Sequence, residues 1–516
     1  MSGQKYSSDI DDKLQVGSSL QSITPSTEEK YKQPSALVVE QSTEELDEKE
    51  LDRIYRKLDL RIIPALWCLY FLTSYGSSAY GVSLTMNSET HNSLIARLHL
   101  SPHHTSIASA LYYVGYIVFD VPFNLIMTRV APQAWLSRIV MTVGLVYGCY
   151  AALSSADGVI AIRFISGMCG AGTWPGMAYY VSLWYPPHRT ARRIGYYFTA
   201  AQVSAAVSGL ISAGFQKMDG QHGLAGFQWM FLIYGIITFF VGISLLWWLP
   251  DRPFKLEEQA PTSKIGIFFE KFAFAQSPIL TPEESALHKK DMQQRYVKVT
   301  WGLSDLWNVL IDVRIIFLVL MYFGVVGTGN GIVVAGTTII KAAVPKLSSI
   351  SLSLLFAPIW ICDLISILIF TPFSDKFKNH RGLAFSLSTV VIIVGIIVNT
   401  FAHAPWARYV GLLICGFGLG PTVPIVMTWT AEIFGPRHGD VGTAASAALV
   451  SGLGNLGSVT TTYALYKGWN GDAARKFLGS NMVIVGILVV SIISSFGLEL
   501  LRRVLGDLKR SNASTV

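Results

Sequence analysis

The chain has 516 residues, of which 51% are hydrophobic and 14% charged, and its mean hydropathy is +0.43. Soluble domains carry about 25% charged residues, so this composition excludes an ordinary soluble enzyme. Basic residues outnumber acidic ones by 40 to 33, which gives a formal net charge of +7. The basic residues recur in short clusters between apolar blocks and not in one patch, which argues against nucleic acid as a partner.

The chain begins with a polar segment, residues 1–57, rich in Ser, Thr, Asp, Glu and Lys. Such a composition cannot bury enough apolar surface to offset the entropy of ordering, so we expect a disordered cytoplasmic tail. The segment lacks the short apolar core and small-residue cleavage site of a secretory signal. The first hydrophobic helix is therefore expected to direct membrane insertion.

Apolar blocks of about 20 residues, the length that crosses a hydrocarbon core of about 30 Å, recur along the rest of the chain. Six lie near residues 62–83, 105–128, 137–154, 160–184, 194–216 and 228–249. Six more lie near 314–340, 349–373, 383–402, 409–431, 441–465 and 478–500. This pattern predicts an all-α membrane protein with twelve transmembrane helices in two six-helix bundles, residues 58–249 and 314–501. A polar central loop, 250–313, joins the bundles, and 502–516 form a C-terminal tail.

The distribution of basic residues indicates how the chain is oriented. More Lys and Arg fall on the side that holds both termini and the central loop, so we expect both termini in the cytoplasm. Most of this excess lies in the tails and the central loop, and the short loops alone give a weaker bias. The expected localisation is multi-pass, in the plasma membrane.

The two sets of blocks resemble each other weakly. Arg163-Phe164 lead through a glycine-rich run to Pro175, and Arg408-Tyr409 lead through a similar run to Pro421. Related six-helix halves are typical of transporters that expose a central site alternately to the two sides. The pattern therefore favours a transporter over a seven-helix receptor or a pore.

Catalytic motifs are not evident in the sequence. We see no phosphate-binding glycine loop, no paired carboxylates in a water-facing domain and no nucleophile elbow. We therefore expect no enzymatic activity and no cofactor, with transport driven by an ion gradient or by the gradient of the solute. The cysteines all fall in apolar blocks without ligand spacing, so we expect neither a metal site nor a disulfide framework. They are Cys68, Cys149, Cys169, Cys362 and Cys415.

Ionisable residues inside the blocks are candidates for ion coupling or gating, because each costs about 2.5–3.5 kcal/mol near a helix centre. Asp120 and Asp363 lie deepest, and Arg163 and Glu432 lie nearer the block ends. One interpretation makes Asp120 or Asp363 a proton relay. The alternative is an interhelical hydrogen bond or a gate pair with a loop arginine such as Arg129.

Aromatic and amide side chains at mid-depth are candidates for binding a polar solute in a wet central cavity. The alternative for Trp and Tyr is a place at the lipid interface or in helix packing. Gln202 and Asn455 are the stronger candidates, because an amide that faces lipid is costly. The full set is Tyr75, Tyr80, Trp174, Tyr179, Gln202, Asn330, Trp429 and Asn455.

Several short segments, taken in order, resemble those of a known family. They are Leu58–Pro64, Asp120–Asn124, Arg163-Phe164 leading to Pro175-Gly176, Tyr179–Pro186, Gly226–Phe231 and Leu249–Pro253. From about Leu58 to Leu501 the chain resembles the major facilitator superfamily and, within it, the fungal allantoate-permease family of anion:cation symporters. The resemblance implies a proton-linked importer of small, usually anionic nutrients.

The chain departs from that family at several charged positions. The family usually has an Asp-Arg pair where Gly76-Ser77 stand here, a Glu where Gly170 stands, and Arg and Glu where Gln228 and Tyr234 stand. These differences remove charges that relatives could use for coupling or for pairing with an anion. Two stretches, residues 73–81 and 172–177, resemble the sulfur-nutrient branch of the family, which takes up cysteine or sulfonates.

The sequence therefore predicts a monomeric, proton-coupled symporter of a small organic anion or zwitterion, either a sulfur compound or a carboxylate, in the lipid bilayer. An uncoupled uniporter of the same fold is the alternative that the missing charges favour. A nutrient sensor without transport activity would need a cytoplasmic output module. Neither the N-terminal tail nor the central loop shows the pattern of a packed domain.

Overall fold

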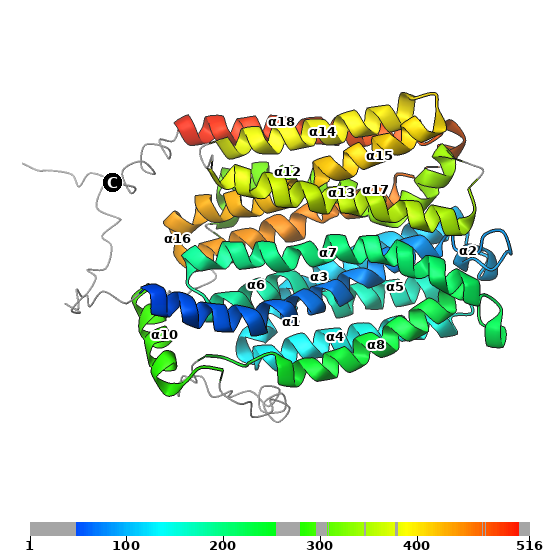
Figure 1. Cartoon of the computed structure of the whole chain (residues 1–516). Helices are drawn as coiled ribbons and strands as arrows, with labels where there is room; N and C mark the ends of the chain where they lie inside the picture. The colour runs from blue at the N-terminus through cyan, green and yellow to red at the C-terminus, as the bar shows by residue number, and fades with distance from the viewer. Residues whose placement is uncertain are drawn as a thin grey trace, which may run out of the picture. The chain divides into compact units, whose positions relative to one another are not determined.

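The structure is a computed structural model that describes residues 48–253, 279–295, 307, 309–344, 347–376, 380–466, 468–469 and 471–504. Within these ranges every regular element is a helix. The helices run side by side along a common direction (Figure 1). Residues 1–47, 254–278, 296–306 and 505–516, which make up most of the expected tails and much of the central loop, lie outside the described residues.

The first half of the chain contains six long helical segments, one of which is broken. They are α1 (Glu48–Ser83), α3 (Pro102–Arg129), α4 (Pro132–Gly148), α5 (Ala156–Gly170) with α6 (Thr173–Trp184), α7 (Pro187–Phe215) and α8 (Gly226–Trp248). The short helix α2 (Leu94–Arg97) and the 3-10 turn Cys149–Ala152 lie between them. Packing pairs α1 with α7, α3 with α5, and α4 with α8.

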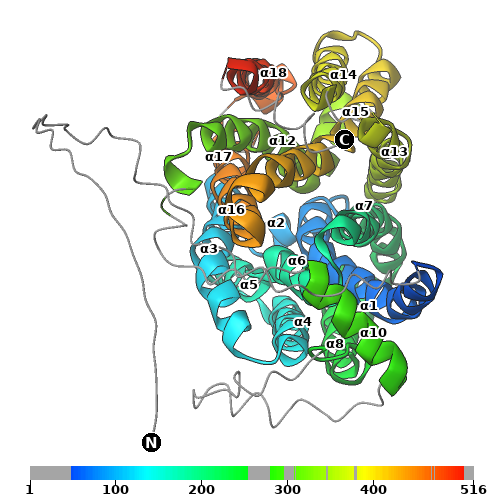
Figure 2. The same cartoon turned by 90° about the vertical axis from the view of Figure 1, so that its left-hand side faces the viewer.

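The second half follows the same plan after α10 (Pro282–Arg295). Its helices are α12 (Val313–Ala343), α13 (Ser349–Lys376), α14 (Arg381–Phe401), α15 (Pro405–Leu419), α16 (Thr422–Gly454), α17 (Leu456–Tyr463) and α18 (Leu478–Val504). Figure 2, which looks along the helices, shows α14 beside α15 and α18. Within this half α12 packs on α16, α17 and α18.

Local signals in the sequence set several helix starts. Ser101 caps α3 by accepting from the backbone N–H of His104, and Pro102 takes the first helical position, where no N–H is needed. Asp312 caps α12 in the same way through the N–H of Arg314. Gly172 separates α5 from α6 with φ +79°, a left-handed conformation that favours glycine.

Eight helical segments in the described part of the chain are long and apolar enough to cross a membrane. In chain order, they correspond to the third, the fifth to tenth and the twelfth of the apolar blocks expected from the sequence. The blocks that miss this criterion are one, two, four and eleven, which form α1, α3, α5 with α6, and the end of α16 with α17. Helices α5 and α6 have 15 and 12 residues, so neither is long enough to cross a membrane by itself.

Three expected boundaries differ from the structure. The tail expected to end at residue 57 is helical from Glu48, because Leu51, Ile54 and Tyr55 bury their side chains. Expected blocks ten and eleven are joined, since helical backbone runs through α16 from Thr422 to Gly454. Helix α18 continues past residue 501 to Val504, with basic residues in its last turn, where they favour the helix dipole.

The central loop contains a packed helix, α10, which the sequence interpretation missed. It lies against the beginning of α1 (Figure 1), and we call this end of the molecule the α10 end. Thr281 and Glu284 form a capping box there, since each side chain accepts from the other's backbone N–H. The sequence Thr281-Pro282-Glu283-Glu284 is the signal that could have predicted this helix.

The two halves are hydrogen-bonded to each other at the opposite end, where α1 finishes, which we call the far end. Lys341 Nζ donates to Ser88 Oγ at 3.2 Å, and the N–H of Ser349 donates to Glu89 Oε1 at 3.1 Å. Closer to mid-depth, Gln216 Nε2 donates to Ser353 Oγ at 2.9 Å. Polar contacts therefore hold α1 and α7 against α12 and α13 at the far end.

Candidate functional site

Arg163 on α5 is a fully buried cation in a cage of tyrosines. Its side chain is 0% exposed, and its Cζ lies 4.0 Å from the ring centre of Tyr80 and 4.3 Å from that of Tyr112. Its Nε donates to the carbonyl of Ala108 at 3.4 Å. The hydroxyl of Tyr150 lies near the guanidinium, but in the described part of the chain neither Nη1 nor Nη2 has a hydrogen bond of good geometry, and no carboxylate pairs with the group.

Tyrosines occupy the space where the family resemblance places charged residues. A Cβ built on Gly76 would collide with the ring of Tyr147, and the atom closest to a Cβ on Gly170 would be the hydroxyl of Tyr112, at 3.9 Å. Tyr147 in turn stacks on Tyr150 with ring centres 5.0 Å apart. Aromatic rings thus surround Arg163, and their cation–π attraction stabilises its charge only in part.

Tyr75 and Tyr234 extend the same aromatic cluster. Their ring centres are 4.7 Å apart, and the hydroxyl of Tyr234 donates to the carbonyl of Leu72 at 2.5 Å. The ring centre of Tyr147 lies 5.4 Å from that of Tyr234. Tyr75, a predicted solute-binding residue, is buried and its hydroxyl has no partner among the described residues.

Asp120 on α3 lies where the broken helix pair α5–α6 changes direction. Its Oδ1 accepts the backbone N–H of Gly172 at 2.9 Å, and its side chain is 1% exposed. Its Oδ2 has no partner in the described part of the chain. Tyr116 and, from the second half, Tyr322 lie within electrostatic range. The carboxyl group therefore faces both its own half and the other one.

Asp363 on α13 occupies the corresponding place in the second half. A Cβ on Gly420, at the α15–α16 break, would lie 2.7 Å from its Oδ1, and the residue is 3% exposed. The side chain of Gln202 of α7 lies near this carboxyl group across the two halves, while Oδ1 has no hydrogen-bond partner in the described part of the chain. Both buried acids thus lie at a helix break and beside a residue of the opposite half.

Trp174 follows the break after Gly172 and belongs to a second aromatic group. Its ring centre lies 5.6 Å from that of Tyr70, 5.8 Å from Tyr197 and 5.2 Å from Phe198. Tyr179, farther along α6, lies within electrostatic range of Arg252 near the α10 end. The structure therefore separates Tyr179 from the group around Trp174.

The amides predicted in the second half form a chain of polar contacts. Asn330 Nδ2 on α12 donates to Ser458 Oγ on α17 at 2.7 Å, and Asn455 Nδ2 donates to the carbonyl of Ser451 at 2.9 Å. Trp429 is 1% exposed and packs on Gly382 of α14. The structure thus places Trp429 against its own half and brings Asn330 and Asn455 together at the α12–α17 contact.

Glu432 forms an ion pair with Arg381 and so lies apart from the two aspartates. Arg381 Nε and Nη2 donate to the two carboxylate oxygens, each at 2.7 Å. The pair joins α16 to the first turn of α14. The side chain of Arg129, the loop partner considered for Asp120, lies outside the described residues.

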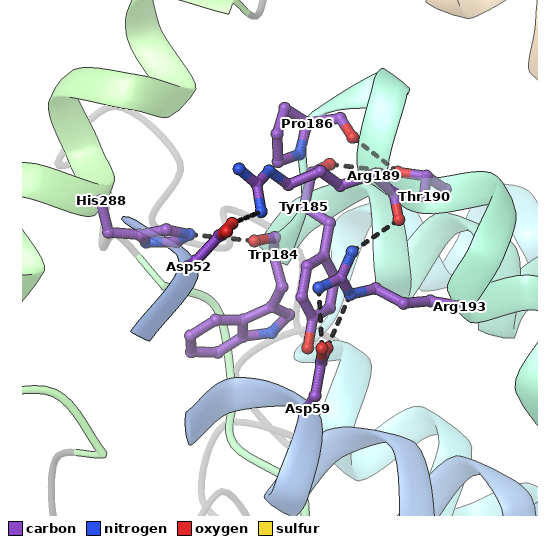
Figure 3. Close-up of polar contacts among 9 residues, drawn as sticks. All are labelled: Asp52, Asp59, Trp184, Tyr185, Pro186, Arg189, Thr190, Arg193 and His288. Atoms are coloured by element: carbon purple, nitrogen blue, oxygen red, sulfur yellow. Dashed lines mark hydrogen bonds and ion pairs between the residues drawn. The ribbon is translucent and has the colours of Figure 1, made fainter. Parts of the chain in front are cut away.

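Polar contacts at the α10 end join α1 to α7 by ion pairs and α10 to the last residue of α6 by a hydrogen bond (Figure 3). Arg193 Nε and Nη2 donate to the two oxygens of Asp59 at 2.6 and 2.8 Å, and Arg189 donates to Asp52. His288 Nε2 of α10 lies 2.9 Å from the carbonyl of Trp184. The Arg189 guanidinium holds the pKa of the Asp52 carboxyl below its usual range.

Helix α10 is fastened to α1 by two further contacts. The hydroxyl of Tyr55 donates to Asp291 Oδ2, and Lys57 pairs with Glu284. The imidazole of His288 packs on the rings of Tyr55 and Trp184, and burial lowers its pKa. A buried imidazole in this position favours its neutral form.

Sequence reasoning missed the tyrosines that surround the buried charges. Tyr112, Tyr116, Tyr147 and Tyr322 come from three expected blocks, and each alone fits helix packing or the lipid interface. Their grouping around Arg163 and Asp120 is a tertiary feature. The signal that could have suggested it is the density of tyrosines in residues 112–116 beside an unusual aspartate.

The chain matches the family model described as Major Facilitator Superfamily over residues 66–462. It is 45% identical over 473 residues to Vitamin H transporter 1 of Schizosaccharomyces pombe, a match that covers 90% of this chain and 82% of that protein. An uncharacterized transporter of the same yeast is also 45% identical, over 464 residues, with 89% and 73% covered.

A solved structure shares the fold at low sequence identity. It is a bacterial homologue of the human lysosomal transporter Spinster in an inward-facing and unoccupied conformation, with a TM-score of 0.62 and 15% identity. The match covers 86% of this chain and 96% of that one. At this identity the likeness concerns the fold alone.

Proposed function

Because the chain belongs to the major facilitator superfamily, we propose that this multi-pass membrane transporter is a proton-coupled symporter of a small organic carboxylate. Its helices have the fold of that superfamily, and the chain is a transporter and not an enzyme. The proposal concerns the solute, the coupling ion and the residues that act on them.

The observation that carries the proposal is the uncompensated charge of Arg163. Burying a cation without a counter-ion is costly, and removing one partner of a buried pair costs about 3–5 kcal/mol. Arg163 has tyrosine rings at 4.0 and 4.3 Å and two nitrogens without a partner of good geometry among the described residues. An anion that reaches this guanidinium would supply the missing charge, and a carboxylate suits its paired donors.

Asp120 and Asp363 are the groups that we assign to proton coupling. Each has one oxygen without a partner among the described residues. Tyr322 of the opposite half lies within electrostatic range of Asp120, and Gln202 of the opposite half lies near Asp363. When the halves move relative to each other, these neighbours must separate or change partners. A proton on either acid would then have a different free energy in the two conformations, which is what coupling requires.

A carboxylate is the preferred solute for two reasons. The relative at 45% identity is named for vitamin H, which is a carboxylic acid, and the aromatic group around Trp174 offers flat apolar surface to an organic body. A sulfur-containing anion, cysteine or a sulfonate, is the second solute class, because residues 73–81 and 172–177 resemble that branch.

The test is uptake by purified protein in liposomes with an imposed pH gradient. We expect labelled vitamin H or another carboxylate to accumulate above its external concentration, and accumulation to stop when the gradient is collapsed. Competition with unlabelled cysteine, sulfonates, nicotinate, allantoate and dipeptides would identify the solute class. Uptake that ignores the pH gradient would refute coupling and support a uniporter, which the glycines at positions 76 and 170 favour.

The proposal includes a location and an assembly state. We place the transporter in the plasma membrane as a monomer, with both termini and α10 in the cytoplasm. Protease accessibility of tags at the two termini in intact and permeabilised cells tests the orientation. Cleavage of both tags and of α10 on intact cells would reverse it.

A further inference from the structure

A groove on the outer surface of the first half is lined by α1, α7 and α8 near the α10 end. Its volume is about 540 Å³, and its lining includes Pro64, Trp67, Cys68, Tyr196, Thr199 and Trp248. Tyr196 and Trp248 are partly exposed. Because these helices cross a membrane, the groove opens toward lipid and not toward the solute path.

The polar atoms inside the groove satisfy one another. Trp67 Nε1 donates to Thr199 Oγ1 at 3.2 Å, and that hydroxyl donates to the carbonyl of Tyr196 at 2.8 Å. Pro64 has no backbone N–H to offer. The walls therefore suit a hydrocarbon chain better than a polar solute.

A cation lies beside the groove. Arg61 Nε and Nη2 donate to the carbonyls of Trp248 and Trp247, each at 3.1 Å, at the end of α8. These acceptors are neutral, and in the described part of the chain no carboxylate pairs with Arg61. A guanidinium has five N–H donors in a planar fork, so donors remain for a phosphate oxygen.

The exposed face of α1 changes from basic to apolar along its length. Arg53 and Arg56 are exposed, Leu60 is 79% exposed, and Pro64 follows one turn later. Residues three and four apart lie on one face of a helix, so these side chains form one stripe. Such a stripe matches the passage from lipid headgroups to acyl chains.

We propose that this groove is a binding site for an anionic phospholipid, with one acyl chain along Trp67 and Cys68 and its phosphate on Arg61. The charge of Arg61 and the apolar lining select this occupant over a zwitterionic lipid or a sterol. A bound lipid of this kind would join α1 to α8 at the place where α8 leads into the central loop.

Native mass spectrometry of the purified full chain tests the site. Phosphatidylglycerol and phosphatidylcholine with the same acyl chains are each added to the delipidated protein. We expect phosphatidylglycerol adducts to exceed phosphatidylcholine adducts by roughly fivefold, the ratio expected from one basic side chain at an anionic lipid surface. Arg61→Gln should abolish this preference. Equal retention of both lipids by the wild type, or an unchanged preference in Arg61→Gln, would overturn the proposal.

Two further variants keep the result interpretable. Arg97→Gln is the matched control. Arg97 also donates to a backbone carbonyl, that of Gly223 at 3.2 Å, but it lies outside the groove. The Arg97→Gln protein should therefore prefer phosphatidylglycerol as strongly as the wild type does. Cys68→Phe fills the groove while Arg61 remains, and should reduce adducts of both lipids. If Arg61→Gln fails to fold, unchanged adducts in Cys68→Phe would still refute the site.

Discussion

The carboxyl group of Asp120 accepts the backbone N–H of Gly172 at 2.9 Å, where α5 gives way to α6. The N–H groups at a helix start lack partners within the helix, and a side-chain acceptor satisfies one of them. Asp363 also lies against Gly420 at the α15–α16 break, although no described N–H donates to its Oδ1. The two buried acids thus connect the kinks of both halves to the surface on which the halves meet.

Replacing Asp120 should separate its structural role from its ionisation. Asp120→Ala leaves the buried N–H of Gly172 without an acceptor, which costs about 1–3 kcal/mol of folding free energy. Asp120→Asn keeps an oxygen for that N–H, so its thermal stability should stay closer to that of the wild type. Thermal unfolding in detergent measures the difference, and equal losses in both variants would contradict the contact.

Asp363→Asn should flatten the pH dependence of transport while leaving folded protein in the membrane. The amide keeps the size and polarity of the carboxyl group beside Gln202 but cannot carry the proton. Initial uptake rates in liposomes at several external pH values test this. Ser366→Ala, a neighbouring buried change on α13, serves as the control. An unchanged pH profile would make Asp363 a structural residue.

Arg163→Gln should weaken solute binding by roughly 10- to 100-fold, since hydrogen bonds to charged groups contribute about 1.5–3 kcal/mol. The readout is the concentration dependence of uptake or direct binding. Arg408→Gln is the matched control, because Arg408 is buried at the corresponding helix but donates to the carbonyls of Asn399 and Thr400. That variant should lose stability with little change in affinity. Equal affinity loss in both would argue against a solute contact at Arg163.

Gly81→Val should disfavour the closed far end. A Cβ on Gly81 would collide with the carbonyl of Val333 on α12, so closure would require α1 and α12 to separate. A cysteine introduced at Ser88, which contacts Lys341 across this gap, should react faster with a membrane-impermeant maleimide in that variant. Gly214→Ala, where a Cβ meets no atom within 4 Å, should leave the rate unchanged. If the introduced cysteine reacts with maleimide in Gly81→Val at the same rate as it does with Gly81 in place, the prediction that packing of α1 on α12 closes the far end is wrong.

Docking of α10 should depend on pH through His288. Burial lowers the pKa of this imidazole, so docking is complete at neutral and higher pH and weakens as pH falls through the lowered value. The facing groups are Tyr55 and Asp291, which bond to each other, and the carbonyl of Trp184. The protection of α10 amides from hydrogen exchange, corrected for the intrinsic pH dependence of exchange, should fall at low pH. His288→Gln, which keeps a donor but does not titrate, should remove this effect. Exchange that responds to pH equally in both proteins would refute it.

Long apolar blocks were readable from the sequence because membrane helices must be continuous and apolar over about 20 residues. Asp120, Asp363 and Arg163 stood out for the same reason, since ionisable groups are rare at such depth. Helix α10 was missed because a polar loop sets no such requirement. The packing of Trp429 on Gly382 of its own half was not predicted either, because sequence position does not fix the direction in which a helical side chain points, and its role in solute binding stays a prediction.

The sequence by itself determined the class of protein, the order of its helices and the short set of charges buried among them. Only the tertiary structure decided what those charges meet. Arg163 is surrounded by tyrosines from several helices, and the two aspartates lie at helix breaks beside residues of the opposite half. The hydropathy of a segment depends only on its own residues and can be predicted from the sequence. The partner of a buried charge is set by packing between segments far apart in the sequence.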